Sequence, residues 1–268
     1  MFGAINGDII GSYYERHRTK DYNFEFKRES TFTDDTVMTV AVCKAILDNP
    51  KPINRFQIRK RGLEYAARFR QYYSFYPHAG FGQMFSQWAK ETEYKINKSY
   101  ANGGAMRAVP IGYAYETIDQ VLLQAKASCY YTHNHREAIT AAQAVAVAVF
   151  LANHGKSKEE IRAYLEKRFR YNLSKPLAQI KETYVFSSRA SYSVPAAIIA
   201  FLESTDYESA VRNAVSLGGD ADTDACIAGG IAEAYYKEIP KHICDFCSRK
   251  LDHTFKTTVL DFKEKFSK

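Results

Sequence analysis

DDTVMTVAVCKAILD, at residues Asp34–Asp48, carries the clearest structural signal in this sequence. Its apolar side chains recur at i, i+3, i+4 and i+7, which is the spacing of one face of an α-helix. They are Val37, Met38, Ala41, Val42, Ala45 and Ile46. Thr33 can cap the start of such a helix, and Asn49-Pro50 can end it. We therefore predict a helix with one apolar face over residues 34–48.

Helical signals also dominate the rest of the chain. SKEE at residues 157–160 is a capping-box pattern that opens a helix. Asp206 can cap a helix that ends at the glycine pair 218–219, and the Ala/Val-rich run 140–153 is too long for a strand, so we expect a central buried helix there. Hairpin signals, internal repeats and linkers are lacking. The sequence thus predicts one compact, mostly α domain over residues 1–268.

The composition is that of an ordinary globular protein. Of the 268 residues, 46% are hydrophobic and 25% are charged, which excludes global disorder and a disulfide-built mini-protein. The longest apolar stretch, residues 141–152, is too short to span a bilayer. Because no basic residue precedes Arg16, the start lacks the charged region of a signal peptide, and we expect a cytoplasmic protein. The net charge of +7 is compatible with anionic partners such as phosphate esters or nucleic acid, but a basic surface without such a partner is the favoured interpretation.

The segment 51–70 is locally basic and leaves two interpretations open. Its cations are Lys51, Arg55, Arg59, Lys60, Arg61, Arg68 and Arg70, against the single acid Glu64. Aromatic residues follow at positions 69–76, and basic residues beside aromatics are what single-stranded nucleic-acid binding uses. A solvated helix face beside core aromatics gives the same pattern, and it is the favoured interpretation.

The five cysteines fit reduced thiols in a cytosolic protein, because their number is odd and their spacing irregular. Cys244 and Cys247 form one C-x-x-C pair. A structural zinc site usually needs four nitrogen or sulfur ligands, and no second pair follows. We therefore expect two half-buried cysteines on a late helix.

Two acidic clusters stand far apart in the sequence, and each opens a predicted helix. The first is FTDDT at residues 32–36, and the second is GGDADT at residues 218–223. One such cluster could simply complement a helix dipole, but two of the same kind favour a shared site. If the helix starts meet, the carboxylates of Asp34, Asp35, Asp220 and Asp222 crowd together. Divalent cations would remove their repulsion, and oxygen ligands suit Mg²⁺, Mn²⁺ or Ca²⁺ rather than zinc.

Three shorter motifs add polar groups to this picture. GDIIGSYYE, at residues 7–15, has two glycines that permit close helix packing, and it ends in the carboxylate of Glu15. ANGGAMR, at residues 101–107, is a glycine loop that enters a helix and offers N–H groups to a phosphate. His133 could donate a hydrogen bond to such a phosphate. Each motif alone also fits a surface glutamate, a plain turn or a structural histidine.

Taken in this order, the pieces resemble the ADP-ribosylglycohydrolase family. The motifs that carry the resemblance are GDIIGSYYE (7–15), FTDDT (32–36), NGGAMR (102–107), THN (132–134), SVPAAI (193–198) and SLGGDADT (216–223). The resemblance spans about residues 3–236. It implies a compact all-α fold with a binuclear magnesium site in a cleft, although Mn²⁺ is a possible alternative.

The resemblance also implies roles for particular residues. The implied metal ligands are Thr33, Asp34, Asp35, Asp220, Asp222 and Thr223. The implied substrate-binding residues are Asn102, Gly103, Gly104 and Met106 for the diphosphate and ribose, His133 on the phosphate side and, more loosely, Tyr192 beside the adenosine. Glu15 matches an acidic residue near the metals, and with Asp34 and Asp35 it is implied to be catalytic. Asp224 departs from the family pattern and is expected to face away from the site.

The activity that the resemblance implies is hydrolysis of the N- or O-glycosidic bond between ADP-ribose and an acceptor. Glu15 would act as the base towards water or as the acid towards the leaving group. The expected partner is an ADP-ribosylated protein. Two alternatives stay open, namely a hydrolase of ADP-ribosylated nucleic acid or of a small ADP-ribose-type metabolite, and a non-catalytic ADP-ribose-binding module. The acceptor linkage and the oligomeric state are open as well.

Overall fold

The computed structural model describes residues 1–266, so the last two residues of the domain expected over 1–268 lie outside the described residues. The helices are α1 (Phe2–Arg16), α2 (Asp34–Asp48), η1 (Arg55–Gln57), α3 (Ile58–Phe75), α4 (Gln83–Lys90), α5 (Gly103–Met106), α6 (Val109–Ala114), α7 (Ile118–Cys129), α8 (Arg136–Asn153), α9 (Lys158–Phe169), α10 (Leu177–Thr183), α11 (Ala190–Leu202), α12 (Tyr207–Val215), α13 (Ala221–Tyr236), α14 (Lys241–Ser248) and α15 (His253–Phe266). Within these residues there is no β-strand, only two isolated bridges, so the all-α prediction is confirmed.

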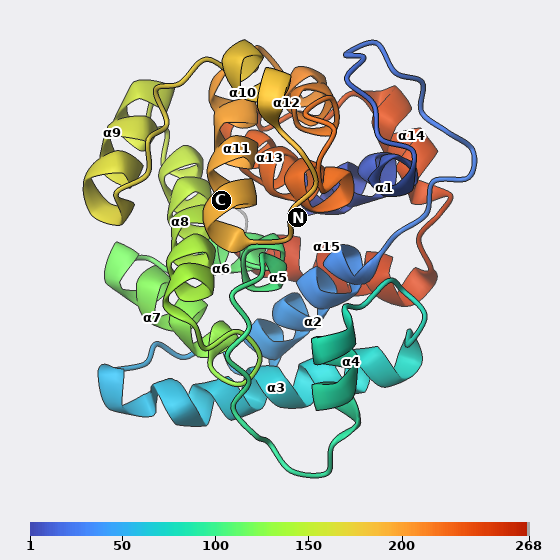
Figure 1. Cartoon of the computed structure of the whole chain (residues 1–268). Helices are drawn as coiled ribbons and strands as arrows, with labels where there is room; N and C mark the ends of the chain where they lie inside the picture. The colour runs from blue at the N-terminus through green and yellow to red at the C-terminus, as the bar shows by residue number, and fades with distance from the viewer. Residues whose placement is uncertain (267–268) are drawn as a thin grey trace.

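The helices form two groups that meet at the middle of the molecule (Figure 1). Helices α1 and α10 to α14 lie in one group, and α2, α3 and α4 lie in the other. The long helix α8 runs along one side, where it packs against α7, α6, α5, α13 and α11. Almost all of α8 from Ala141 to Ala152 is buried, which confirms the central buried helix expected over 140–153.

Helices α1 and α13 make the most extensive helix–helix contact in the described chain, because glycines bring their backbones together. A β-carbon placed on Gly7 would lie 2.1 Å from the carbonyl oxygen of Ala225, and one on Gly11 would lie 2.3 Å from that of Ala221. Even the methyl group of an alanine would overlap backbone atoms of α13 at both positions. The close packing predicted for the 7–15 motif is therefore confirmed, and it fixes the end of α1 beside the start of α13.

The predicted helix ends agree with the structure at most positions. The Thr33 side chain accepts a hydrogen bond from the Asp35 backbone N–H at the start of α2, and that helix stops before Asn49. The capping box at residues 157–160 is formed at the start of α9. The end predicted at 218–219 was wrong, because α12 stops at Val215. Gly218 adopts φ +72° in the turn that follows, and this turn leads the chain into the start of α13.

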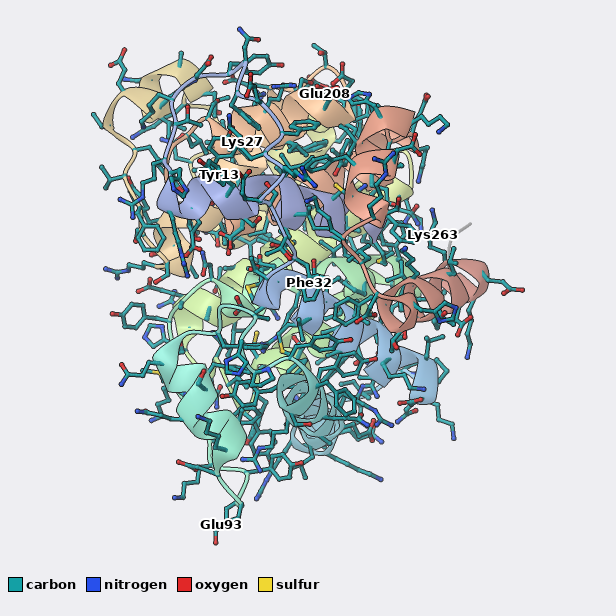
Figure 2. All side chains as sticks on the ribbon, turned by 90° about the vertical axis from the view of Figure 1, so that its right-hand side faces the viewer. Tyr13, Lys27, Phe32, Glu93, Glu208 and Lys263 are labelled. Atoms are coloured by element: carbon teal, nitrogen blue, oxygen red, sulfur yellow. The ribbon has the colours of Figure 1, made fainter. Side chains whose placement is uncertain are left out.

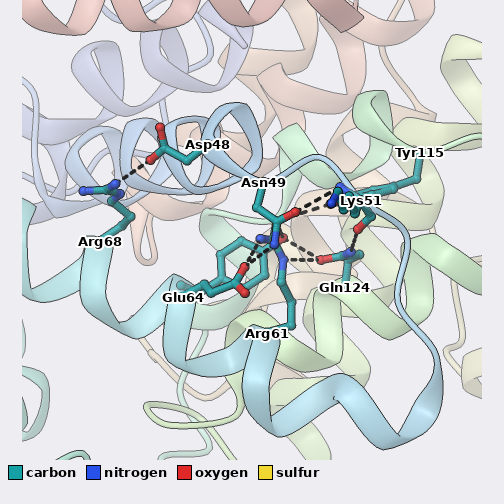
Figure 3. Close-up of polar contacts among 9 residues, drawn as sticks. Asp48, Asn49, Lys51, Arg61, Glu64, Arg68, Tyr115 and Gln124 are labelled. Carbon is teal, nitrogen blue, oxygen red and sulfur yellow. Dashed lines mark hydrogen bonds and ion pairs between the residues drawn. The ribbon is translucent and has the colours of Figure 1, made fainter.

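The basic segment 51–70 is partly neutralised inside the molecule (Figure 3). Arg61 is buried, and it donates to Gln124 at 2.9 Å and pairs with Glu64 at 2.5 Å. Arg68 pairs with Asp48 at 2.7 Å, and Arg70 donates to backbone carbonyls at residues 88–93. The exposed cations of the segment are Lys51, Arg55, Arg59 and Lys60. The favoured interpretation, a solvated helix face beside core aromatics, agrees with these exposed cations, but it was wrong for Arg61, which is buried.

Two further predictions concern the cysteines and the membrane. Cys244 and Cys247 lie on α14, where Cys247 is buried and Cys244 is partly exposed, and both are free thiols. None of the helices within residues 1–266 is long and apolar enough to cross a membrane.

Candidate active site

One cavity of about 440 Å³ collects almost all of the polar residues predicted from the sequence. Its acidic wall consists of Glu15, Thr33, Asp34, Asp35, Asp220, Asp222 and Thr223. A second wall of the cavity consists of Asn102, Gly103, Met106 and His133. The two acidic clusters, which are far apart in the sequence, therefore meet in space as expected.

Three helix ends deliver the acidic side chains. Glu15 comes from the last turn of α1, Asp34 and Asp35 open α2, and the second cluster opens α13. Carboxylate oxygens of Asp8, Asp35 and Asp222 lie within 4.8 Å of one another. A second group with the same spacing consists of Glu15, Asp220 and Asp222. Asp222 belongs to both groups, which places them next to each other.

Asp8 is the member of this cluster that the sequence reasoning missed. It is fully buried on α1, and its carboxylate accepts hydrogen bonds from Thr33 and Thr36 at the start of α2. The donors are both backbone N–H groups, each at 3.0 Å, and both hydroxyls. Asp8 thereby ties α2 to α1 and sets the position of the two aspartates that open α2. A charged residue in an apolar helix rarely stays buried without partners, and this was the available signal.

The charges of the cluster act strongly on one another. Burial, the like charges of Asp8 and Asp220, and the proximity of Glu15 raise the pKa of Asp34 to about 8. Burial together with neighbouring carboxylates also raises the pKa values of Asp35 and Asp222 well above the usual value. One oxygen of Asp35, Oδ1, is buried and has no hydrogen-bond partner among residues 1–266. Oxygen donors that repel one another and are left unpaired fit a hard divalent cation.

A hydrogen bond joins the second wall of the cavity to the acidic wall. The side-chain amide of Asn102 donates to Asp220 at 2.8 Å and to Ser193 at 3.2 Å, so it orients a carboxylate of the cluster. Gly103 packs against the imidazole of His133, from which a β-carbon would be 2.9 Å away. Gly104 lies behind the wall, against Cys129, and does not line the cavity.

The sequence model of the family described as ADP-ribosylglycohydrolase matches residues 1–266. The chain belongs to the ADP-ribosylglycohydrolase family. It is similar to ADP-ribosylhydrolase ARH3 of Xenopus tropicalis, with 28% identity over 89% of this chain and 86% of that protein. It is likewise similar to ADP-ribosylhydrolase ARH3 of Homo sapiens, with 26% identity over 88% of this chain and 84% of that protein. A solved structure, titled ADP-ribosylglycohydrolase-related protein complex, matches with a TM-score of 0.72 and 25% identity over 98% of this chain and 94% of that one.

These matches cover both cavity walls of this ADP-ribosylglycohydrolase, and they identify the chain as an enzyme of that family. Asp224, which departs from the family pattern, lies outside both carboxylate groups and accepts a hydrogen bond from Tyr184 at 3.0 Å. It does not line the acidic cavity, although burial and the charge of Asp220 raise its pKa.

The aromatic residues of the cavity differ from the one that the sequence suggested. Tyr192 stacks on Tyr184 with ring centroids 4.9 Å apart, and it lines a neighbouring groove rather than the acidic cavity. The cavity itself is lined by Phe81, Phe85, Tyr100 and Phe186. The sequence offers little reason to choose these four, because its 20 tyrosines and 17 phenylalanines are many equivalent candidates. Figure 2 shows how densely side chains fill the space around Phe32, which precedes the acidic residues of α2.

Proposed function

We propose that this enzyme is a hydrolase that uses two Mg²⁺ ions, with Mn²⁺ as a possible substitute, to cleave the glycosidic bond between ADP-ribose and an acceptor. The observation that carries the proposal is the pair of carboxylate groups that share Asp222, of which every member except Asp8 lines the cavity. The proposed ligands are Thr33, Asp34, Asp35, Asp220, Asp222 and Thr223. When bound, such ions supply Lewis-acid chemistry, which orients ribose hydroxyls and water and offsets the charge of the carboxylates.

Glu15 is proposed to move the proton in the reaction. It lies at the end of α1, it is half-buried, and it faces the cavity next to Asp220. Burial and the charge of Asp220 raise its pKa, which brings a carboxylate closer to the pH at which it can both accept and donate a proton. Glu15 would accept the proton of the attacking water or deliver one to the leaving group.

The remaining wall is proposed to hold the ADP-ribose. Asn102, Gly103 and Met106 line the cavity beside His133. The backbone N–H groups of Asn102 and Met106 already donate to the carbonyls of Ser188 and Asn102, so the N–H of Gly103 at the start of α5, together with the imidazole, is proposed to contact the diphosphate. The net charge of +7 favours an anionic substrate. We propose an ADP-ribosylated protein as the partner, because three cations of segment 51–70 are already bound within the molecule. The cytoplasmic location stays a prediction.

The proposal is tested with defined substrates that carry ADP-ribose on arginine, serine, a nucleic-acid end or a small molecule. The released sugar nucleotide is measured by mass spectrometry with Mg²⁺ and with EDTA. We expect release from at least one substrate with Mg²⁺, and its loss with EDTA and in Asp35→Asn and Asp222→Asn. Equal rates with Mg²⁺ and EDTA would contradict the metal mechanism. Binding of ADP-ribose without release from any substrate would favour the binding-module alternative.

A matched control separates ligation of the metal from general effects of removing a buried charge. Asp224→Asn neutralises a fully buried carboxylate of the same helix that belongs to neither carboxylate group. Mg²⁺ should raise the melting temperature of the native protein and of Asp224→Asn, because an ion that binds the folded state stabilises it. It should not raise that of Asp35→Asn or Asp222→Asn.

A further inference from the structure

His133, the histidine of the cavity, is hydrogen-bonded to Thr132, its neighbour in the sequence. His133 is only 6% exposed, and it lines the cavity from the loop that follows α7. Its ring nitrogen Nδ1 lies 2.9 Å from the hydroxyl oxygen of Thr132. The other ring nitrogen, Nε2, is on the side of Gly103, since a β-carbon on that glycine would be 2.9 Å from it. The two nitrogens therefore have different neighbours, namely the Thr132 hydroxyl for Nδ1 and Gly103, which also lines the cavity, for Nε2.

A hydrogen bond from a buried arginine determines the role of the Thr132 hydroxyl oxygen, which must act as an acceptor. Arg107 is fully buried, and its Nη2 donates to the Thr132 hydroxyl oxygen at 2.6 Å and to the Ser128 carbonyl at 3.0 Å. Its guanidinium lies 4.0 Å from the ring centroid of Phe69, which leaves it little freedom to turn away. Because a guanidinium only donates, the Thr132 oxygen must be the acceptor in this pair.

One acceptor is then left for the hydrogen of the Thr132 hydroxyl within the described residues. Within residues 1–266, the other hydrogen-bond partner of the Thr132 hydroxyl is Nδ1 of His133. If Nδ1 also carried a hydrogen, the buried Thr132 hydrogen would have no acceptor, which is unfavourable in a protein interior. The hydroxyl therefore donates to Nδ1, and Nδ1 is the unprotonated nitrogen of the ring.

The surroundings also keep the ring neutral. Burial and the positive charge of Arg107 hold the pKa of His133 well below its usual value. A neutral imidazole with an unprotonated Nδ1 carries its single hydrogen on Nε2. This nitrogen can then only donate a hydrogen bond, and it cannot accept a proton from a substrate or a water.

We propose that Arg107 and Thr132 are positioning residues that fix His133 as the neutral tautomer with its hydrogen on Nε2, so that it donates a hydrogen bond to an anionic oxygen in the cavity. The identity of that oxygen, a diphosphate oxygen of ADP-ribose, rests on the proposed function, whereas the tautomer does not. His133 binds and orients the substrate, and the proton chemistry is left to the acidic wall. Thr132 and Arg107 also line the same cavity, and in this proposal they act by holding His133.

The tautomer is read directly from the full-length protein without ligand. Nitrogen-15 NMR of the histidine side chains at pH 7 distinguishes a protonated from an unprotonated ring nitrogen, and the signals of His133 are assigned by their loss in His133→Gln. We expect an unprotonated Nδ1 and a protonated Nε2. A hydrogen on Nδ1, or on both nitrogens, would overturn the proposal whatever the variants do.

Variants at Thr132 test the cause of the tautomer. Thr132→Val keeps the shape of the side chain but removes the hydroxyl, so we expect Nδ1 and Nε2 signals that move towards a mixture of tautomers. Thr132→Ser restores the hydroxyl and should restore the native signals. Unchanged signals in Thr132→Val would show that the hydroxyl does not set the tautomer, and they would refute the role of Thr132. If Thr132→Val does not fold, the native signals and those of Thr132→Ser still decide the question.

Ligand binding tests the use of the hydrogen bond. Calorimetry with ADP-ribose and with inorganic pyrophosphate should show tighter binding to His133→Gln, whose amide can donate, than to His133→Leu, which cannot, by about tenfold or more. Equal affinities of these two variants would overturn the donor role. If the native protein shows the expected tautomer but binds neither probe, the proposed function fails while the assignment of the tautomer stands.

Discussion

Replacing Gly7 by alanine should destabilise the fold, because α1 and α13 touch through their backbones at this point. The added β-carbon would lie 2.1 Å from the Ala225 carbonyl oxygen and 2.5 Å from its carbonyl carbon. A carbon and an oxygen in ordinary contact are more than about 3 Å apart, so the helices must separate by roughly 1 Å. Neither atom belongs to a side chain that could rotate away.

The expected loss follows from two opposing effects. Overpacking a well-filled core costs about 1–3 kcal/mol, and the contact with rigid backbone places this variant at about 3 kcal/mol. Alanine stabilises a helix interior by about 1 kcal/mol relative to glycine, which offsets part of this cost. The net loss is therefore about 2 kcal/mol in the free energy of unfolding, which lowers the melting temperature by about 4–8 °C for a chain of roughly this size.

Differential scanning calorimetry of the native protein, Gly7→Ala and the control Gly82→Ala measures this effect. A β-carbon on Gly82 would meet no atom within 4 Å, and its φ of −60° suits alanine, so the control should melt within about 2 °C of the native protein. If Gly7→Ala also melts within 2 °C of the native protein, the helices are not held at the distance described here. Activity should fall as well, because α1 carries Asp8 and Glu15.

Three further predictions concern buried polar groups. Asp35→Asn should raise the melting temperature in EDTA, because it removes one of several repelling buried charges, and a fall would contradict this electrostatic account. Asp8→Ala should lower the free energy of unfolding by at least about 2 kcal/mol in urea titration, since the Thr33 and Thr36 donors lose their acceptor, and a change below about 0.5 kcal/mol would refute the tie between α1 and α2. The low pKa of His133 means that only the unfolded chain binds a proton there as the pH falls from about 7 to about 5, so stability is lost in that range. His133→Gln should lose less melting temperature than the native protein over the same range, and an equal or larger loss would contradict the buried neutral ring.

The fold could be predicted to a large extent because its signals are local. Thr33 before the apolar run 34–48 and the capping box at 157–160 lie next to the helices that they start. The end of α12 could not be predicted, since the glycine pair after it serves the turn into α13 rather than the helix end. Residues next to a helix start identify that start well. Glycines in a turn that positions a distant contact, however, look the same in the sequence as glycines that end a helix.

The candidate site was predictable where its residues form compact motifs, and it was not where a role depends on a distant partner. Asp8 looked like part of a helix because its partners, Thr33 and Thr36, lie a full loop away in the sequence. The burial of Arg61 depends on Gln124, which comes from another helix. Charge counted along the segment could not reveal that this arginine is inaccessible.

The amide of Asn102 joins the two walls of the cavity through one side chain, since it donates to Asp220 on one wall while its own backbone belongs to the other. A shift of the glycine loop at 102–104 would therefore move the Asp220 carboxylate, and a shift of that carboxylate would move the loop. A single amide thus sets the position of a carboxylate that the proposed function assigns to the metals, from a residue that it assigns to the substrate. Loss of this side chain would therefore disturb both parts of the cavity together.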